Sequence, residues 1–171
     1  MRTICSAVAL IFAQSLCALP GMLSVSQGEA AAAMQSLQEM EISASDGAVL
    51  EWESFSIGAD ETVRFLQPNA SALAVNRVMS QEISSLLGRL EANGRIVLLN
   101  PNGILVGQGA VIDTGSFVAA TFDQLEHVRS GHLEFGAGRN RTEGQIFARA
   151  GEVAFAAGRI EQSGRIEALQ G

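Results

Sequence analysis

Glycine residues near the carboxyl end of the chain separate short apolar strands at an almost constant interval. The segments Gly-Gln-Ile, Gly-Glu-Val, Gly-Arg-Ile and Gly-Arg-Ile place apolar residues at Ile146, Val153, Ile160 and Ile166. These residues are seven, seven and six positions apart, so three short strands follow one another within 20 residues. Three short strands and three corners in each turn are typical of a parallel β-helix, whose coils stack on one another. The pattern therefore predicts an all-β fold of this kind.

Side chains within these strands alternate as half-buried strands require. We expect Ile160 and Ile166 to point inward and their charged neighbours to form a solvated, charge-paired outer face: Arg159, Glu161, Arg165 and Glu167. The pattern continues less regularly through apolar stretches at 96–98, 104–106, 111 and 117–118. A β-sandwich is the rival architecture, but its hairpin-linked strands recur at about 8 to 12 residues, a longer interval than the one found here.

Two segments do not fit the coil pattern. Residues 80–92 place Ile83, Leu86, Leu87 and Leu90 at the spacing of one helix face, and thus predict a short helix lying on the coil. Residues 51–65 alternate strongly around a polar turn and predict strands. We expect these strands to cap the amino-terminal end of the β-helix, because an open end exposes unpaired strand edges.

The amino-terminal region has the three parts of a secretory signal peptide. A basic residue, Arg2, precedes a mainly apolar run at 4–19, and small residues follow at 30–33. We therefore expect a signal peptide at 1–33, with cleavage near Ala33. A membrane anchor is the alternative, although the apolar run is shorter than the roughly 20 residues that span a bilayer.

The remaining chain divides into a lead segment at 34–48 and a β-helix domain at 49–171. We expect this domain to be truncated, because the repeat stops at Gly171 in the middle of its pattern. Both cysteines, Cys5 and Cys17, lie in the expected signal peptide, so the mature chain has no thiol for a disulfide or a metal site. A lipoprotein signal at Cys17 is disfavoured because Leu16, directly before it, is large.

Composition argues against several functions. The formal net charge is −7, which disfavours nucleic-acid binding. His127 and His132 lack the third or fourth ligand that a metal site needs, and we interpret them as part of a surface loop. Asp113 and Asp123 are isolated, and the chain has no lysine, so the clustered acids and bases of a polysaccharide lyase or hydrolase are missing. We expect no enzyme activity and no cofactor. A glycan-binding groove remains an alternative function.

A tight corner separates two apolar stretches in the middle of the chain. The run Asn100, Pro101, Asn102, Gly103 and Ile104 lies between the segments Ile-Val-Leu-Leu and Ile-Leu-Val. Proline fixes its own φ, glycine can adopt a positive φ, and asparagine side chains can bond the backbone of a turn. The run therefore predicts a corner between two buried strands.

Residues from about 49 to 123 resemble the amino-terminal secretion domain of filamentous-haemagglutinin-like exoproteins, which use two-partner secretion. Three blocks carry this resemblance, at 52–78, 86–110 and 115–123, and the second contains the Asn-Pro-Asn-Gly corner. The resemblance implies a right-handed parallel β-helix with an amino-terminal cap. It also implies passage through the general export machinery to the periplasm, and then recognition by an outer-membrane β-barrel transporter.

The resemblance further assigns roles to residues. Asn100 to Ile104 would contribute to transporter recognition and to starting the fold at the cell surface. A second polar block matches the family at Gln67, Pro68, Asn69, Ser71, Asn76 and Arg77. The chain would be secreted or displayed on the cell surface, and adhesion to a host or cell-surface glycan or protein would belong to passenger sequence absent here. The alternative is a carbohydrate-binding or polysaccharide-degrading β-helix.

Overall fold

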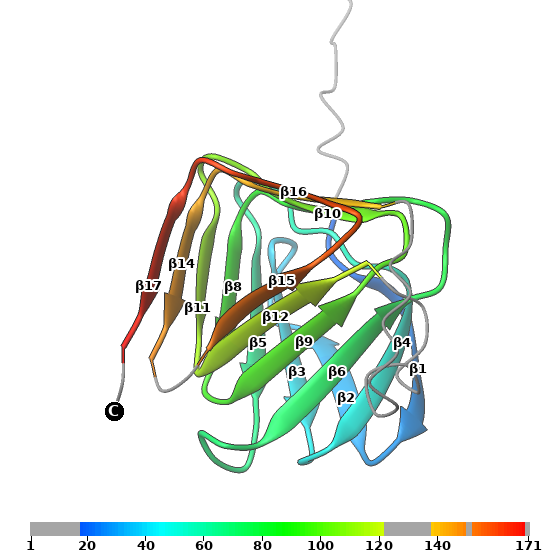
Figure 1. Cartoon of the computed structure of the whole chain (residues 1–171). Coiled ribbons are helices and arrows are strands. Elements are labelled where there is room, and N and C mark those ends of the chain that lie inside the picture. Colours follow the sequence, from blue (N-terminus) through cyan, green and yellow to red (C-terminus); the bar gives the residue numbers. More distant parts are fainter. Residues whose placement is uncertain (1–17, 122–137, 150–151, 170–171) are drawn as a thin grey trace, which may run out of the picture.

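Three sheets form the walls of the molecule, and the chain winds through them in successive coils whose strands pair in parallel (Figure 1). The computed structural model describes residues 18–121, 138–149 and 152–169, and every regular element within these ranges is a strand. The strands are β1 (Gly21–Gln27), β2 (Ala30–Met34), β3 (Glu39–Ala44), β4 (Ala48–Ser54), β5 (Thr62–Leu66), β6 (Leu73–Val78), β7 (Ser84–Leu86), β8 (Arg89–Ala92), β9 (Arg95–Leu99), β10 (Gly103–Val106), β11 (Val111–Thr114), β12 (Ser116–Ala120), β13 (Arg139–Thr142), β14 (Gln145–Ala148), β15 (Val153–Ala156), β16 (Arg159–Gln162) and β17 (Arg165–Ala168).

From β6 onward, each coil contributes one strand to each wall. The six-stranded sheet has the order β1-β4-β6-β9-β12-β15, the four-stranded sheet β16-β13-β10-β7, and the seven-stranded sheet β17-β14-β11-β8-β5-β3-β2. One coil is thus β9, β10 and β11, and the next coil stacks on it in parallel. The predicted all-β parallel β-helix is confirmed, as are the strands expected at 96–98, 104–106, 111 and 117–118.

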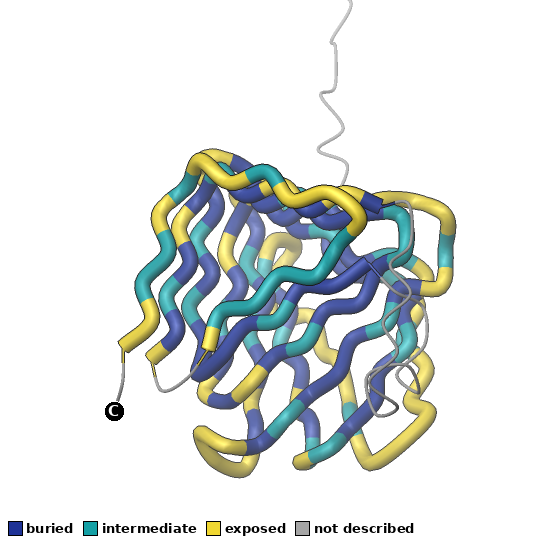
Figure 2. The backbone as a smooth tube through the Cα atoms, in the orientation of Figure 1, coloured by how far each residue is buried: buried dark blue, intermediate teal, exposed yellow. Residues whose placement is uncertain are grey.

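Apolar side chains stack in columns inside the solenoid, one residue from each coil. On the seven-stranded sheet the parallel pairing aligns Met40, Val63, Leu90, Ile112, Ile146 and Ile166. Figure 2 shows the resulting alternation of buried and exposed positions along the strands. Ile160 is in register with the inward residues Ile104 and Asn140, but it is 49% exposed because β16 is the outermost strand of its sheet.

The helix predicted at 80–92 is wrong, because this segment forms β7 and β8. Leu86 and Leu90 are fully buried, and they pair with Val106 and Ile112 of the next coil. Between the two strands the chain turns at Gly88, where an added Cβ would lie 2.2 Å from the carbonyl oxygen of Gly58. Pairing with neighbouring coils therefore outweighs a local spacing that also suits a helix.

An amino-terminal cap is present, but residues other than the predicted ones form it. Strand β1 pairs antiparallel with β4, and β2 pairs antiparallel with β3. Strands β4 and β5, which cover most of 51–65, are ordinary coil strands with parallel neighbours at β6 and β8. The signal-peptide boundary near Ala33 falls inside β2, and that boundary stays a prediction. None of the described residues form a helix long and apolar enough to cross a membrane.

Candidate functional site

The Asn-Pro-Asn-Gly run forms the corner between β9 and β10, as predicted. The backbone N–H of Gly103 donates to the carbonyl oxygen of Asn100 at 3.2 Å and closes a tight turn. Gly103 has a φ of 128°, in a region that L side chains rarely adopt. An added Cβ there would lie 2.7 Å from the carbonyl oxygen of Arg139, in the following coil. Glycine is therefore required by both the local backbone and the stacking.

The side chain of Asn100 connects this corner to the preceding coil. Asn100 is fully buried, and its Nδ2 donates to the carbonyl oxygen of Glu82 at 2.9 Å and to Oγ of Ser84 at 3.0 Å. Its Oδ1 accepts the backbone N–H of Asn102 at 2.9 Å and the side-chain Nδ2 of Asn102 at 3.4 Å. All four bonds depend on one buried amide, and removing it leaves buried polar groups without partners. Asn100 thus shapes the corner from inside.

Pro101 and Asn102 form the accessible part of the corner, since both are partly exposed, whereas Gly103 and Ile104 are buried. The Nδ2 of Asn102 donates to the carbonyl oxygen of Ser80 at 2.9 Å, which fixes its orientation. Ser80, Glu82 and Ser84 were not identified from sequence, because nothing in the chain marks which backbone segment lies under a corner of the next coil.

A pocket of about 390 Å³ adjoins this corner on the outer face of the four-stranded sheet. Its lining joins apolar side chains to charged ones: Ile83, Asn102, Gly103, Ile104, Leu105, Arg139, Arg141 and Glu161. Ile83 is 52% exposed. Arg141 pairs with Glu143 at 2.5 Å. The corner therefore continues into a surface that is partly apolar and partly cationic.

The first part of the second polar block forms the corner before β6. Gln67 is 7% exposed, and its Nε2 donates to the carbonyl oxygens of Ala72 at 2.9 Å and Arg95 at 3.2 Å. Its backbone is held by Asn93 of the next coil through reciprocal bonds of 2.7 and 2.6 Å. Gln67 therefore maintains the stacking of two coils.

The tip of this corner is exposed at Pro68, Asn69 and Ser71. Asn69 Oδ1 accepts the backbone N–H of Ser71 at 3.0 Å and its hydroxyl at 2.7 Å. These bonds stay within the loop, so they stabilise its local turn without anchoring it to another coil.

The last two residues of the block lie in β6 on opposite sides of the sheet. Asn76 is fully buried and accepts the indole N–H of Trp52 on Oδ1 at 3.0 Å. Trp52, 1% exposed, also makes an edge contact with Phe55, with ring centroids 5.6 Å apart, so it cannot act as a sugar platform. Arg77 pairs with Glu51 at 3.0 Å on the outer face.

The two corners lie at opposite ends of the six-stranded sheet (Figure 1). The corner at 67–72 precedes β6, and the corner at 100–103 follows β9. Strand β6 has six residues, which corresponds to a separation of about 20 Å. The structure therefore does not bring the two predicted blocks together into one site.

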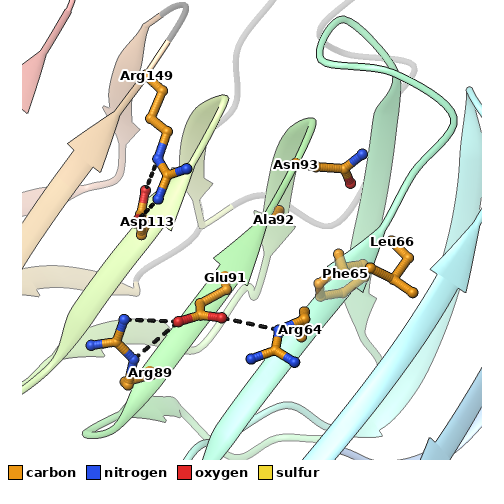
Figure 3. Close-up of a pocket in the computed structure, with 9 residues that line it drawn as sticks. All are labelled: Arg64, Phe65, Leu66, Arg89, Glu91, Ala92, Asn93, Asp113 and Arg149. Carbon is orange, nitrogen blue, oxygen red and sulfur yellow. Dashed lines mark hydrogen bonds and ion pairs between the residues drawn. The ribbon is translucent and has the colours of Figure 1, made fainter.

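A second pocket, of about 280 Å³, lies on the outer face of the seven-stranded sheet (Figure 3). Glu91 accepts hydrogen bonds from Arg89 and Arg64, and Asp113 from Arg149. Hydrogen bonding to Arg89, assisted by Arg64, lowers the pKa of Glu91, although its partial burial acts in the opposite direction. The hydrogen bond to Glu91 raises the pKa of Arg64, and the one to Asp113 raises the pKa of Arg149.

These ion pairs bear on the predicted absence of enzyme chemistry. Asp113 was expected to be isolated, but it lies in β11 and is paired with Arg149. Carboxylates held by arginines are solvated structural pairs, as in the predicted pairing of Arg159 with Glu161 at 2.7 Å. The described residues contain no cluster of histidine, cysteine and carboxylates that could hold a metal ion. His127 and His132 lie outside the described residues.

A parallel β-solenoid with an antiparallel amino-terminal cap is the fold of secretion domains found in two-partner exoproteins. The family model described as "TPS secretion domain" matches residues 26–170, and the chain belongs to this family. It is a family of secretion domains and not of enzymes. Its members are parts of exoproteins exported through the periplasm with an outer-membrane transporter as partner.

Comparisons with individual proteins agree with this assignment. The chain is 39% identical over 102 residues to a heme/hemopexin-binding protein of Haemophilus influenzae. This match covers 60% of the chain and 11% of that protein. It is 43% identical over 79 residues to a heme/hemopexin-binding protein from another strain of Haemophilus influenzae. This match covers 46% of the chain and 9% of that protein. The crystal structure of the HMW1 secretion domain from Haemophilus influenzae is similar with a TM-score of 0.81 and 30% identity, over 87% of this chain and 42% of that one. The chain thus spans about a tenth of the curated relatives.

Proposed function

We propose that this chain is the part of an exoprotein that an outer-membrane transporter recognises, and that it brings the exoprotein to the cell surface or the medium. Adhesion belongs to passenger sequence outside the chain. Membership of the secretion-domain family supports this proposal. The observation that carries it is the corner at 100–103, where a buried amide shapes a turn whose tip stays accessible.

The five residues of this corner have two different roles in our proposal. Asn100, Gly103 and Ile104 start and hold the fold, because their buried positions leave no surface for a partner once the coil has formed. Pro101 and Asn102 contact the transporter, because they are the accessible residues of the turn. A transporter that binds Asn100 itself must do so before this coil folds.

The second block divides in the same way. Gln67 and Asn76 are buried and bonded within the fold, so their proposed role is structural. Pro68, Asn69 and Ser71 form an exposed tip, and Arg77 lies on the outer face. We assign transporter contact to the tip alone, and its distance from the first corner requires a separate part of the transporter.

Export from cells with and without the matching transporter tests this function. We expect the native chain to reach the medium only when the transporter is present, and Asn100→Ala and Asn102→Ala to lower that yield. Gln108→Ala is the matched control, because Gln108 is an exposed amide in the next corner with no side-chain hydrogen bond in the described structure. Export that is independent of the transporter, or equal for all variants, contradicts the proposal. Sugar binding by the purified chain would favour the carbohydrate-binding alternative.

A further inference from the structure

Glu61 is a buried carboxylate directly before β5, and it is 7% exposed. Its Oε2 accepts the backbone N–H of Gly58 at 2.7 Å, and its Oε1 accepts the backbone N–H of Ala18 at 2.8 Å. An added Cβ at Gly58 would lie 3.0 Å from Glu61 Cδ, so glycine leaves room for the carboxylate to fold back over the turn. In the described part of the chain Glu61 makes no ion pair. A buried carboxylate without a nearby cation is costly.

The residues that follow Ala18 belong to the folded domain. Leu19 is 8% exposed and packs in the main core cluster. Strand β1 begins two residues later and pairs with β4, and β2 pairs with β3. Cleavage near Ala33 would remove β1 and most of β2, and would expose the edge of β4 and the core surface under Leu19.

The residues before Ala18 fit the end of a signal peptide. The apolar run that starts at Ile4 reaches this position, and small residues occupy the two positions that matter for cleavage: Ser15 and Cys17, at three and one residues before the bond. Cleavage one residue later would place the large Leu16 at the first of these positions.

We propose that the signal peptide is removed between Cys17 and Ala18, and that the new amino terminus of Ala18 forms an ion pair with Glu61. Water hydrolyses the peptide bond, so that Cys17 leaves with a carboxylate and Ala18 keeps an ammonium group. The bond from Ala18 to Glu61 then changes from a neutral amide donor to a charged donor, which is the stronger kind. The processed chain thereby gains a counter-charge for its buried carboxylate, and the precursor lacks one.

Intact-mass measurement and amino-terminal sequencing of the full chain recovered from the periplasm or the medium give the first test. We expect a mature chain that begins at Ala18. A chain that begins at a lipid-modified Cys17, at Leu19 or at Met34 overturns the proposal.

The second test uses a protein of residues 18–171, in which the absence of lysine makes the α-amino group of Ala18 the one primary amine. An N-hydroxysuccinimide acetate ester acetylates this amine at constant pH in three folded proteins: the wild type, the Glu61→Gln variant and the Asp60→Asn variant. The ion pair keeps the amine protonated and covered, so we expect Glu61→Gln to react about fivefold faster than wild type. Asp60 is exposed and adjacent, and Asp60→Asn is the control that reacts at the wild-type rate.

Equal rates for the wild type and Glu61→Gln overturn the ion pair. If Glu61→Gln does not fold, the wild-type and Asp60→Asn proteins are compared in buffer and in urea. Both are then expected to react about fivefold more slowly when folded than when unfolded. Equal reactivity in the two states also overturns the proposal.

Discussion

The two polar corners of the six-stranded sheet use similar residues in different ways. At 100–103 the asparagine side chains reach into the preceding coil, where Asn100 bonds Glu82 and Ser84 and Asn102 bonds Ser80. At 67–72 the tip residues Asn69 and Ser71 bond each other, and the side chain of Gln67 bonds the next coil beside a backbone bond from Arg95 to Ala72. Residue type therefore does not separate a structural corner from an accessible one, whereas the destination of each hydrogen bond does.

The largest expected effect is that of a side chain at Gly103. Gly103→Ala combines a φ of 128° with a Cβ placed 2.7 Å from a backbone oxygen, and we expect it to lower the free energy of unfolding by about 4 kcal/mol. Gly47→Ala is the matched control, because Gly47 has a φ of 73° with nothing within 4 Å, and should cost about 1 kcal/mol. Urea unfolding of the full chain measures both, and similar losses would show that the stacking contact is unimportant.

A smaller loss is expected at Asn100. Asn100→Ala removes an amide that makes four hydrogen bonds from a fully buried position, and it should lower the free energy of unfolding by about 3 kcal/mol. The loss should appear in urea unfolding of the protein without any transporter. The control variant Gln108→Ala should keep the wild-type free energy of unfolding. A fully stable Asn100→Ala protein that is exported poorly would mean that Asn100 acts in recognition and not in folding.

The smallest effect on stability is expected at the exposed tip of the other corner. Asn69→Ala removes bonds within a solvated loop, and it should change the free energy of unfolding by no more than about 0.5 kcal/mol. If the tip contacts the transporter, export falls although stability does not. A loss as large as that of Asn100→Ala would show that the two corners are equivalent.

Sequence alone predicted the features that repeat along the chain. The glycine-punctuated strands indicated the parallel coils, and the Asn-Pro-Asn-Gly run indicated a corner with a positive φ at Gly103. Features that depend on contact between coils were missed or misassigned. The spacing of Leu86 and Leu90 suited a helix as well as two strands, and only pairing with Val106 and Ile112 decides between them.

The residues that form the cap and the partners of the site were also beyond sequence reasoning. Strands β1 and β2 lie in a region whose small and apolar residues resemble the end of a signal peptide. The residues of the two blocks could be named from the sequence, but which of them are accessible, and how far apart the blocks lie, follow from the order of strands around the solenoid. Burial of Asn100 and Gln67 likewise depends on neighbouring coils, whose residues are remote from them along the chain.

The inward column of the seven-stranded sheet has a consequence for how such a chain can change in length. Successive members of the column are separated by unequal stretches of chain, the longest from Ile112 to Ile146 and the shortest from Ile146 to Ile166, and yet they remain in register. A residue inserted within a strand would turn its side chains to the opposite face, whereas residues inserted at a corner leave the stack unchanged. Corners are therefore the places where this architecture can acquire new segments, and a fixed period is not required for its coils to stack.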